Sequence, residues 1–534
     1  MSMPGIRRSI TDLQDDYEQG NKAPLEKLMR AWKGIKELDP SNLRSFFTLG
    51  GFHGEPFRGP GETDPAWWGG YCQHGTVLFP AWHRVYLYQL EKALQSIEGC
   101  GDVMLPFWDE CSEESRIKGV PWALTEEFFE LDGKRIANPL RSFVLPVGIV
   151  DQVQGDNALY SKHKGYETVR YPLSGLVGTP EDRVATAAHN AKYPDYGVNV
   201  GILNKNIIEW LNTSFMIDGK QRGEIYAKFV ACLDAPTYTL FSNTTSAAAW
   251  NNANPHQLVM PLETPHNYMH LAVGGFDVPG QGSASLIPGA NGDMGENDTA
   301  GLDPIFYFHH CFIDYAFWTW QKRNGATDSF TIDASDPGAH YVLGAGSNNQ
   351  PPADSDPNQT ITMQTGLDPF TKADGSSFTA ADAINIETQL GYAYGPGSLD
   401  QFAERTAFFG DAAAQPAENA RTVHVSGLDR SKIPGSFIIS AYAEIDGERR
   451  SLGHEPVLSR WHVAGCANCQ THLRVSANFV LPVAGPGSEP PVHIEIKTRD
   501  AVLRHRLVAA GEERALTEAE AEAAPQPAFN VEIR

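Results

Sequence analysis

The segments HGTVLFPAWHRVYLYQLE (residues 74–91) and DPIFYFHHCFID (residues 303–314) decide the fold, because each sets histidine in aromatic, helix-forming sequence. A third segment, ETPHNYMH (residues 263–270), adds two more histidines. Imidazoles in apolar surroundings need partners, since burying a polar group without a hydrogen bond or a metal costs free energy. These segments therefore predict helices that enclose a metal site.

The first cluster consists of His74 and His83, with His53 upstream in GGFHGEPF. Pro80 is tolerated in the first turn of a helix, because its missing N–H would have no partner there. We therefore predict a helix over 80–94 that holds His83 rigidly. Taken alone, His74 and His83 would equally well be two ordinary core histidines. His53 is a candidate because a site with three protein nitrogens needs one more than these two provide.

The second cluster begins with His266 and His270, which stand four residues apart. On a helix both imidazoles therefore project from one face. Either His309 or His310 would complete a set of three. The alternative is an amphipathic core helix with a buried histidine pair, and the presence of two histidine-rich helical segments argues against it.

The donor set indicates which metal is bound. Three neutral imidazoles per metal, without carboxylate or thiolate, suit copper or zinc better than magnesium, calcium or manganese. Paired zinc sites usually include carboxylates, and neither cluster contains one. Two copper ions that handle dioxygen are therefore the better inference.

Composition limits the class of protein. A chain of 534 residues suggests about two to four domains, and two is our working interpretation. The formal net charge of −23 argues against nucleic acid and anionic membranes as partners. We find no secretory signal and no long apolar run, so we expect a cytoplasmic location. Seven thinly spread cysteines do not indicate a disulfide framework.

Hydrophobic periodicity makes the first half mainly α and the end mainly β. Between them, 272–300 is predicted to be a flexible loop at a pocket rim, and 325–380 to form long surface loops. From Arg421 onward, alternating segments predict a small antiparallel sandwich. The predicted helices lie within 9–48, 80–94, 205–217, 222–233, 266–271 and 303–323. The predicted strands are RTVHVSGL, GSFIISAYAEI, HLRVSANFVLPV, PVHIEIKT and FNVEIR.

Segments 74–91 and 303–314 resemble the copper A and copper B signatures of the tyrosinase family, the type 3 dicopper proteins that include catechol oxidases and hemocyanins. The resemblance covers about 45–325 in recognisable motifs. It implies a mainly α fold in which a four-helix-bundle dicopper core with long loops is followed by a C-terminal antiparallel β-sandwich domain. It also implies two copper ions, in a dinuclear type 3 site, that bind O2.

The resemblance also implies a ligand set. Of the doublet, His310 matches the family ligand because it stands four residues before Asp314, which leaves His309 as a neighbour. Cys72 matches the cysteine that fungal-type members join by a thioether to the histidine two residues on, here His74; a free buried thiol is the alternative. The implied ligands are His53, His74 and His83 for the first copper, and His266, His270 and His310 for the second.

Two further positions match residues implied in catalysis. Glu263 and Asn267 match the carboxylate and amide that hold a water able to take a phenol's proton. A phenol with a pKa near ten must lose its proton before it binds Cu(II), so a positioned base helps. Glu263 would alternatively be a first-turn acid that favours the helix dipole. Tyr315 departs from the family, which commonly has Arg or Lys there, and puts the usual ion pair in doubt.

The C-terminal part also has a parallel in the family. Tyr392-Ala-Tyr394 resembles the Tyr-x-Tyr element that closes the catalytic core in fungal and plant members. In their latent forms a sandwich domain that covers the active site follows it. The resemblance therefore implies a zymogen with a dicopper core at 1–395, a linker at 396–420 and a lid domain at 421–534.

Two features of the lid domain are candidates for a role at the site. Val457, Leu458 and Trp461 are candidates for a side chain that plugs the pocket. Cys466 and Cys469 form a CxxC pair whose soft thiolates suit Cu(I), which favours copper delivery. A redox disulfide and half of a zinc site are the competing interpretations.

The sequence thus predicts a copper-dependent, tyrosinase-like polyphenol oxidase that is inhibited by its own C-terminal domain. With O2 it would hydroxylate monophenols at the ortho position and oxidise o-diphenols to o-quinones. The expected partners are small phenols and O2, without nucleic acid or membrane, and a homo-oligomer is compatible with the sequence. The alternatives are a catechol or o-aminophenol oxidase without monophenolase activity and, less favoured, a hemocyanin-like oxygen carrier.

Overall fold

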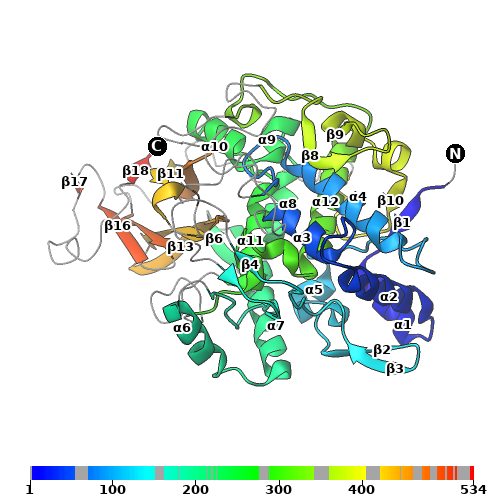
Figure 1. The fold of residues 1–534 in the computed structure, drawn as a ribbon. Helices are drawn as coiled ribbons and strands as arrows, with labels where there is room; N and C mark the ends of the chain where they lie inside the picture. The colour runs from blue at the N-terminus through cyan, green and yellow to red at the C-terminus, as the bar shows by residue number, and fades with distance from the viewer. Residues whose placement is uncertain are drawn as a thin grey trace.

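The structure is a computed structural model, and its helices gather in the part of the chain before Phe402 (Figure 1). It describes residues 3–54, 70–150, 161–177, 180–212, 214–217, 220–223, 225–275, 287, 289–341, 360–403, 421–433, 435–445, 447–460, 463, 472–481, 490–498, 502–508, 512–513 and 529–534. The helices are α1 (Ile10–Glu18), α2 (Ala23–Glu37), α3 (Phe46–His53), α4 (Phe79–Gln95), α5 (Glu113–Lys118), α6 (Pro180–Asn190), α7 (Tyr196–Asn212), α8 (Ile225–Cys232), α9 (Tyr238–Ser242), α10 (Thr244–Ala253), α11 (Glu263–Gly274) and α12 (Ile305–Arg323).

The helical part also contains short pairs of strands. They are β2 (Phe128–Leu131) with β3 (Lys134–Ala137), β4 (Ile149–Val150) with β5 (Ser161–Lys162), β6 (Ser214–Ile217) with β7 (Lys220–Gly223), and β8 (Gly366–Thr371) with β9 (Ser377–Thr379). One further pair is parallel and joins β1 (Gly5–Arg7) to β10 (Tyr392–Tyr394).

Helices α11 and α12 lie at the centre of the core. Every residue of α11 is buried, and so is every residue of α12 from Ile305 to Gln321. A helix that is buried all round must be enclosed by other elements. Helix α12 packs against α4, and α11 packs against α7, α8 and strand β13. The histidines on α11 and α12 therefore lie deep in the core.

Two predicted segments differ from the structure. The predicted helix over 205–217 is wrong at its end, because α7 stops at Asn212 and β6 pairs with β7 as an antiparallel hairpin. Phe215 and Ile217 favour strand, and Asp218-Gly219 in the sequence is typical of a hairpin connection. The stretch 325–380, predicted as loops, contains the β8–β9 pair. Of the predicted flexible loop at 272–300, the described residues from 290 to 300 are buried.

The C-terminal strands form two antiparallel sheets, as predicted. One has the order β14–β11–β18 and the other β13–β12–β15–β16–β17. Buried apolar residues between Val423 and Ile496 form a hydrophobic cluster separate from the large one that runs from Ile10 to Phe402. The strands are β11 (Arg421–Asp429), β12 (Phe437–Ile445), β13 (Glu448–Val457), β14 (Arg474–Leu481), β15 (Val492–Lys497), β16 (Val502–Val508), β17 (Glu512–Glu513) and β18 (Asn530–Ile533).

Among the described residues, we find no helix that combines the length and apolar character needed to cross a bilayer.

Candidate metal centre

Six histidines from four helices and one loop point into the interior of the core. His53 ends α3, His83 lies on α4, His74 lies in the loop just before α4, and α11 and α12 carry the rest. His74 is partly exposed. The other five, His53, His83, His266, His270 and His310, are at most 2% exposed.

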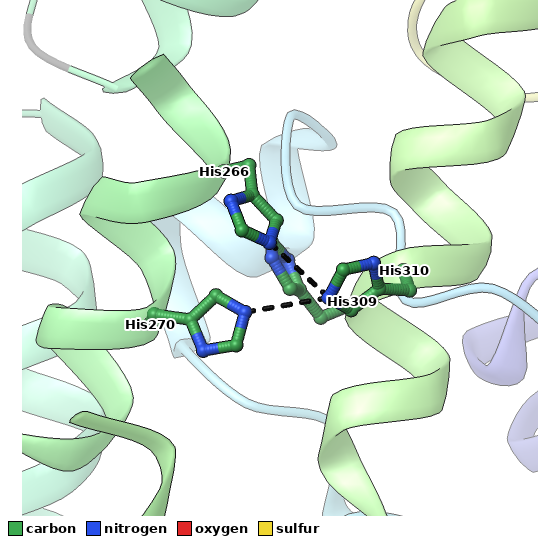
Figure 2. Close-up of side chains that lie close together, drawn as sticks. All are labelled: His266, His270, His309 and His310. Atoms are coloured by element: carbon green, nitrogen blue, oxygen red, sulfur yellow. Dashed lines mark hydrogen bonds between the residues drawn. The ribbon is translucent and has the colours of Figure 1, made fainter. Parts of the chain in front are cut away.

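The second group of histidines faces inward from α11 and α12 (Figure 2). The Nε2 atom of His310 lies 3.2 Å from Nε2 of His266 and 3.3 Å from Nε2 of His270. Neutral imidazoles present a lone pair at any ring nitrogen that carries no proton. Three such nitrogens in contact form a set of donors for a cation.

The first group has the same character. The ring centroids of His53, His74 and His83 lie 5.2 to 5.7 Å apart. Their Nε2 atoms are buried and have no hydrogen-bond partner among the described residues. A buried polar atom without a partner is costly unless something else binds it. These three atoms are therefore donors that fit a metal ion.

Backbone carbonyl groups fix which nitrogen is free in three of the six rings. A carbonyl oxygen only accepts, so an imidazole nitrogen facing it must carry the ring proton, and the other nitrogen keeps its lone pair. The Nδ1–H groups donate as follows: His53 to Asn297 O (3.2 Å), His83 to Phe79 O (2.8 Å) and His270 to Met294 O (2.9 Å).

Burial keeps the histidines neutral. Desolvation lowers the pKa of His53 to about 3 and holds the pKa values of His266 and His310 well below the usual range; neighbouring imidazoles add to the effect. The same causes lower the pKa values of His74, His83 and His270. Neutral imidazole is the form that binds metal.

Within the doublet, His309 has a different partner from His310. Its Nδ1 lies 2.6 Å from the Glu110 carboxylate, and both side chains are fully buried. Its donor atom still belongs to the group of four histidines whose nitrogens lie within 4.8 Å of one another. Sequence reasoning did not single out Glu110, because nothing local to WDEC indicates its contact with α12. Burial raises the pKa of Glu110 well above its usual range.

Cys72 lies beside the first group. Its Sγ is 3.3 Å from His74 Nδ1, and the thiol is buried. Burial raises the pKa of Cys72 to about 11. Asn297 donates to the same sulfur over 3.7 Å, so the residue that orients His53 also contacts Cys72.

Glu263 and Asn267 lie at the start of α11 and are buried. The Glu263 carboxylate accepts from the Gly75 N–H (2.8 Å) and from the N–H and hydroxyl of Thr244 (2.8 and 2.9 Å). Burial raises its pKa. Asn267 Oδ1 lies 2.9 Å from His266 Nδ1. Glu263 therefore tethers the loop that carries His74, and Asn267 orients His266.

A cavity of about 500 Å³ lies between the core and the C-terminal sheets. His74, Glu263 and Asn267 line it from the core, and Val457 and Leu458 line it from the end of β13. Two of the three predicted plug residues therefore border the same space as the site. Trp461, Cys466 and Cys469 lie outside the described residues.

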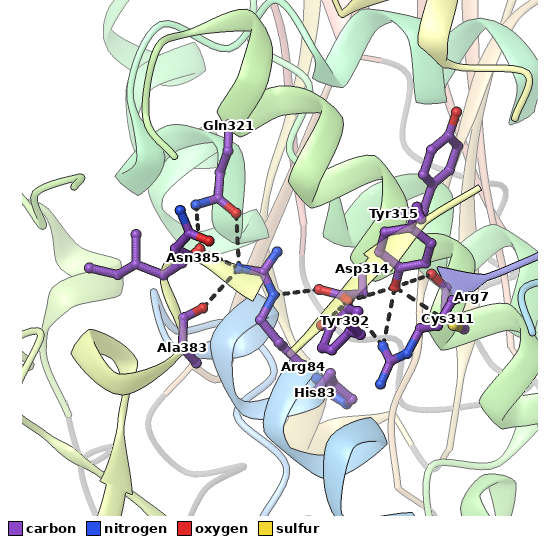
Figure 3. A network of polar contacts seen from close by, with 12 residues as sticks. Arg7, His83, Arg84, Cys311, Asp314, Tyr315, Gln321, Ala383, Asn385 and Tyr392 are labelled. Atoms are coloured by element: carbon purple, nitrogen blue, oxygen red, sulfur yellow. Dashed lines mark hydrogen bonds and ion pairs between the residues drawn. The ribbon is translucent and has the colours of Figure 1, made fainter. Parts of the chain in front are cut away.

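A network centred on Asp314 holds the helices of the site together (Figure 3). Asp314 on α12 pairs with Arg84 on α4 (2.5 Å) and with Arg7 on β1 (3.4 Å). The hydroxyls of Tyr392 and Tyr394 donate to the same carboxylate over 2.6 Å each. The Tyr-x-Tyr element thus fixes α12 through hydrogen bonds.

Asp314 has cationic partners even though the next residue is Tyr315. Arg84 and Arg7 supply the positive charge from elsewhere in the chain, and Tyr315 instead stacks on Phe107 with ring centroids 5.0 Å apart. The departure from the family pattern therefore changes how α12 is packed without removing the ion pair.

Comparison with known proteins identifies the family. The common central domain of tyrosinase matches residues 43–323. Tyrosinase HcTyr2 of Hahella sp. is 50% identical over 498 residues, which cover 89% of this chain and 88% of the relative. A tyrosinase of Aspergillus oryzae is 42% identical over 501 residues, 88% of this chain and 87% of that protein.

The chain belongs to the tyrosinase family.

Solved structures agree with this assignment. Tyrosinase from Burkholderia thailandensis at low pH is 47% identical, with a TM-score of 0.81 over 99% of this chain and 100% of that one. The holo-protyrosinase of Aspergillus oryzae superposes with a TM-score of 0.62 over 96% and 97% of the two chains. At 18% identity the second likeness shows the fold alone. The predicted helical core followed by antiparallel sheets is confirmed.

As a tyrosinase, the protein is a copper-dependent oxidase of monophenols and diphenols. The family implies a dinuclear copper centre, and the residues present fit it. Each of the two groups offers neutral, buried imidazole nitrogens and no carboxylate oxygen, which is a donor set suited to copper. This assignment replaces the two alternatives considered from the sequence, an oxygen carrier and an oxidase restricted to diphenols.

Proposed function

We propose that His53, His74 and His83 hold one copper and that His266, His270 and His310 hold the other. The observation that carries this proposal is the convergence of buried Nε2 atoms in two groups, unpartnered in the first and in contact with one another in the second. We place His309 outside the ligand set because His310, four residues before Asp314, matches the family ligand; Glu110 contacts Nδ1 of His309. The copper pair would supply O2 binding and two-electron chemistry.

The protein's own residues would bind the phenol and manage its proton. The cavity bounded by His74, Glu263 and Asn267 confines the ring and limits the access of water. Glu263 and Asn267 would place a water that accepts the phenol proton. Because the Glu263 carboxylate already accepts three hydrogen bonds from the chain, its second contribution is to keep the His74 loop in position.

We propose that residues 421–534 form a lid domain that makes the full-length enzyme latent. The proposed core is 1–395 and the proposed linker is 396–420, although Leu399 and Phe402 still pack on the core cluster. Leu458 packs against Leu271 of α11 and lines the cavity, which supports a role as a plug. Val457 borders the same space. The assignment of Trp461 stays a prediction.

We propose that Cys72 becomes joined to His74 by a thioether. A carbon–sulfur bond would form while the thiol S–H and a ring C–H bond break. The two electrons and two protons would pass to O2, the oxidant that the enzyme already uses. The 3.3 Å contact between Cys72 Sγ and the His74 ring supports this. A peptide mass lighter by two hydrogen atoms in copper-loaded protein is expected, and an unchanged mass after turnover would refute the bond.

The copper-delivery role proposed for Cys466 and Cys469 stays a prediction, supported by the chemistry of the CxxC sequence alone. Its test is whether a Cys466→Ser/Cys469→Ser variant loads copper more slowly than the unmodified chain.

The proposed function is tested by turnover of a monophenol and a diphenol after protease trimming in 404–420. We expect trimmed, copper-loaded protein to oxidise both tyrosine and a catechol. Rapid catechol oxidation without any tyrosine turnover would overturn the proton-accepting role of Glu263 and Asn267.

A further inference from the structure

Residues 292–298, here called the strap, contact both groups of histidines. The Met294 carbonyl accepts from His270 Nδ1, and the Asn297 carbonyl accepts from His53 Nδ1. One short segment thus orients a histidine in each group. All seven strap residues are buried.

The strap lies in direct backbone contact with the ends of the two helices that carry these histidines. A Cβ placed on Gly54, next to His53, would lie 1.8 Å from the carbonyl oxygen of Asp298. A Cβ placed on Gly274 would lie 1.9 Å from the backbone nitrogen of Gly295. These contacts leave no room for a side chain. A displacement of the strap would therefore also displace the ends of α3 and α11.

On the core side, one buried ion pair anchors the strap. Asp293 lies 2.5 Å from Lys162 Nζ, and both side chains are at most 2% exposed. The carboxylate also accepts from the Tyr166 hydroxyl (2.7 Å) and the Val169 N–H (2.8 Å). The N-terminal half of the strap is therefore fixed by the core alone.

On the other side, the C-terminal sheets hold the strap. Arg460 Nη2 lies 2.7 Å from Asp298 Oδ1, and both side chains are fully buried. The Ser436 hydroxyl donates to the Gly295 carbonyl over 3.0 Å. The surface on which the lid docks is thus the segment that orients His53 and His270.

We propose that Arg460 of the lid is a positioning residue for the copper site, acting through Asp298 and the strap on His53 and His270. Lid docking and copper binding then strengthen each other, because a coupling between two equilibria is reciprocal. The inference rests on the proposed lid and ligand set and deepens them. The lid would help to hold the metal as well as cover the cavity.

The test uses the full-length, copper-loaded protein and the double variant Asp298→Asn/Arg460→Gln, which removes both charges and leaves no unpaired ion. The copper affinity measured by competition with a chelator should fall about 5- to 150-fold, the usual range of such couplings, and copper should be lost to the chelator faster. Amide hydrogen exchange of the strap and of residues 46–54 should also rise in the copper-free protein.

The matched control is Thr422→Val. Thr422 donates to the Pro255 carbonyl over 2.8 Å, so this variant weakens a lid contact away from the strap. It should release copper at the rate of the unmodified chain. If the double variant does not fold, Ser436→Ala removes the contact with Gly295 and should give a smaller change in the same direction.

Unchanged copper release and strap exchange in the folded variants would overturn the inference. An equal acceleration by Thr422→Val would overturn it too, because general loosening of the lid would then explain the effect. Failure of the proposed function is distinct, since it would show as unmodified, trimmed protein that lacks copper or phenol turnover.

Discussion

At the scale of single residues, the two members of the histidine doublet differ in their contacts. His309 and His310 are equally buried, so burial does not separate them. The Glu110 carboxylate contacts Nδ1 of His309, whereas Nε2 of His310 contacts the Nε2 atoms of His266 and His270. Because Nε2 of His309 is also buried without a hydrogen-bond partner among the described residues, the proposal of His310 as the ligand rests on its spacing from Asp314.

His310→Gln should therefore abolish binding of the second copper, because it removes one of three imidazoles. His309→Gln, its matched control, should keep both coppers with affinity lowered about 10- to 100-fold, as is usual when a residue that supports a ligand is lost. Metal analysis of the purified variants measures this. The opposite pattern would make His309 the ligand.

Asn267→Ala in the trimmed enzyme should lower kcat/KM for a monophenol about 100-fold, the lower end of proton-transfer contributions. Diphenol oxidation should fall less, since a catechol is the more easily oxidised substrate. Asn252→Ala is the control, because Asn252 lines the same cavity. Equal losses on both substrates would show that Asn267 only orients His266.

The proposed ligands could be named from the sequence, but the groups that orient them could not. Histidine spacing and the flanking aromatic residues form a recognisable sequence motif. No motif marks the backbone carbonyl groups of Met294 and Asn297. Glu110 is 199 residues from His309, so no local pattern connects them. Residues that position a ligand are found only once the fold brings distant segments together.

At the scale of elements, a buried charge network holds α4, α12, β1 and β10 together. Burial by itself would raise the pKa of Asp314, but Arg84 and Arg7 hold it below the usual value. The folded state therefore favours the ionised carboxylate. This contribution is fully present above the unfolded pKa of about 3.9. It is lost as the pH falls through the lowered folded pKa.

Asp314→Asn should cost about 3–5 kcal/mol at neutral pH, because it leaves the buried Arg84 without its carboxylate, while Arg7 keeps its ion pair with Glu91. The variant should also lose less stability than the unmodified chain as the pH falls below about 4. Denaturant unfolding at several pH values measures both effects. Asp102→Asn, in an exposed pair with Lys27, should change little. A loss of similar size in both variants would contradict the role given to the network.

Strong periodicity made some elements predictable and weak periodicity hid others. The segments predicted at 80–94 and 303–323 are α4 and α12 to within two residues. Strands β13 and β16 were missed, because ERRSLGHEPV and VLRHRLV carry charges that obscure the alternation. Their strand pairing comes from neighbours in the sheet, chiefly β12 and β15, rather than from local preference.

At the scale of the whole molecule, the core and the C-terminal sheets have separate large hydrophobic clusters and meet through polar contacts and a small apolar cluster of Leu271, Ile438 and Leu458. Thr264 donates to Glu455 over 3.1 Å, and Arg460 pairs with Asp298. The Tyr-x-Tyr resemblance predicted a lid, but these pairs join segments far apart in sequence and could not be predicted. Because the two large clusters are separate, we expect this interface to open without unfolding either part.

Leu458→Ala in the uncut chain should raise diphenol turnover above that of the unmodified latent protein, because it widens the cavity beside His74 and Glu263. Val480→Ala is the control, since Val480 lines a neighbouring groove instead of the site cavity. Initial rates with a catechol measure the difference. An equal rise in both variants would indicate a loosened lid rather than a removed plug.

The most direct test of a latent dicopper oxidase is to measure copper content and diphenol turnover before and after limited proteolysis in 404–420. We predict two coppers per chain at both stages, with turnover that appears only after the cut. A full-length chain that is as active as the trimmed one would contradict latency, and a chain that binds no copper would contradict the metal site itself.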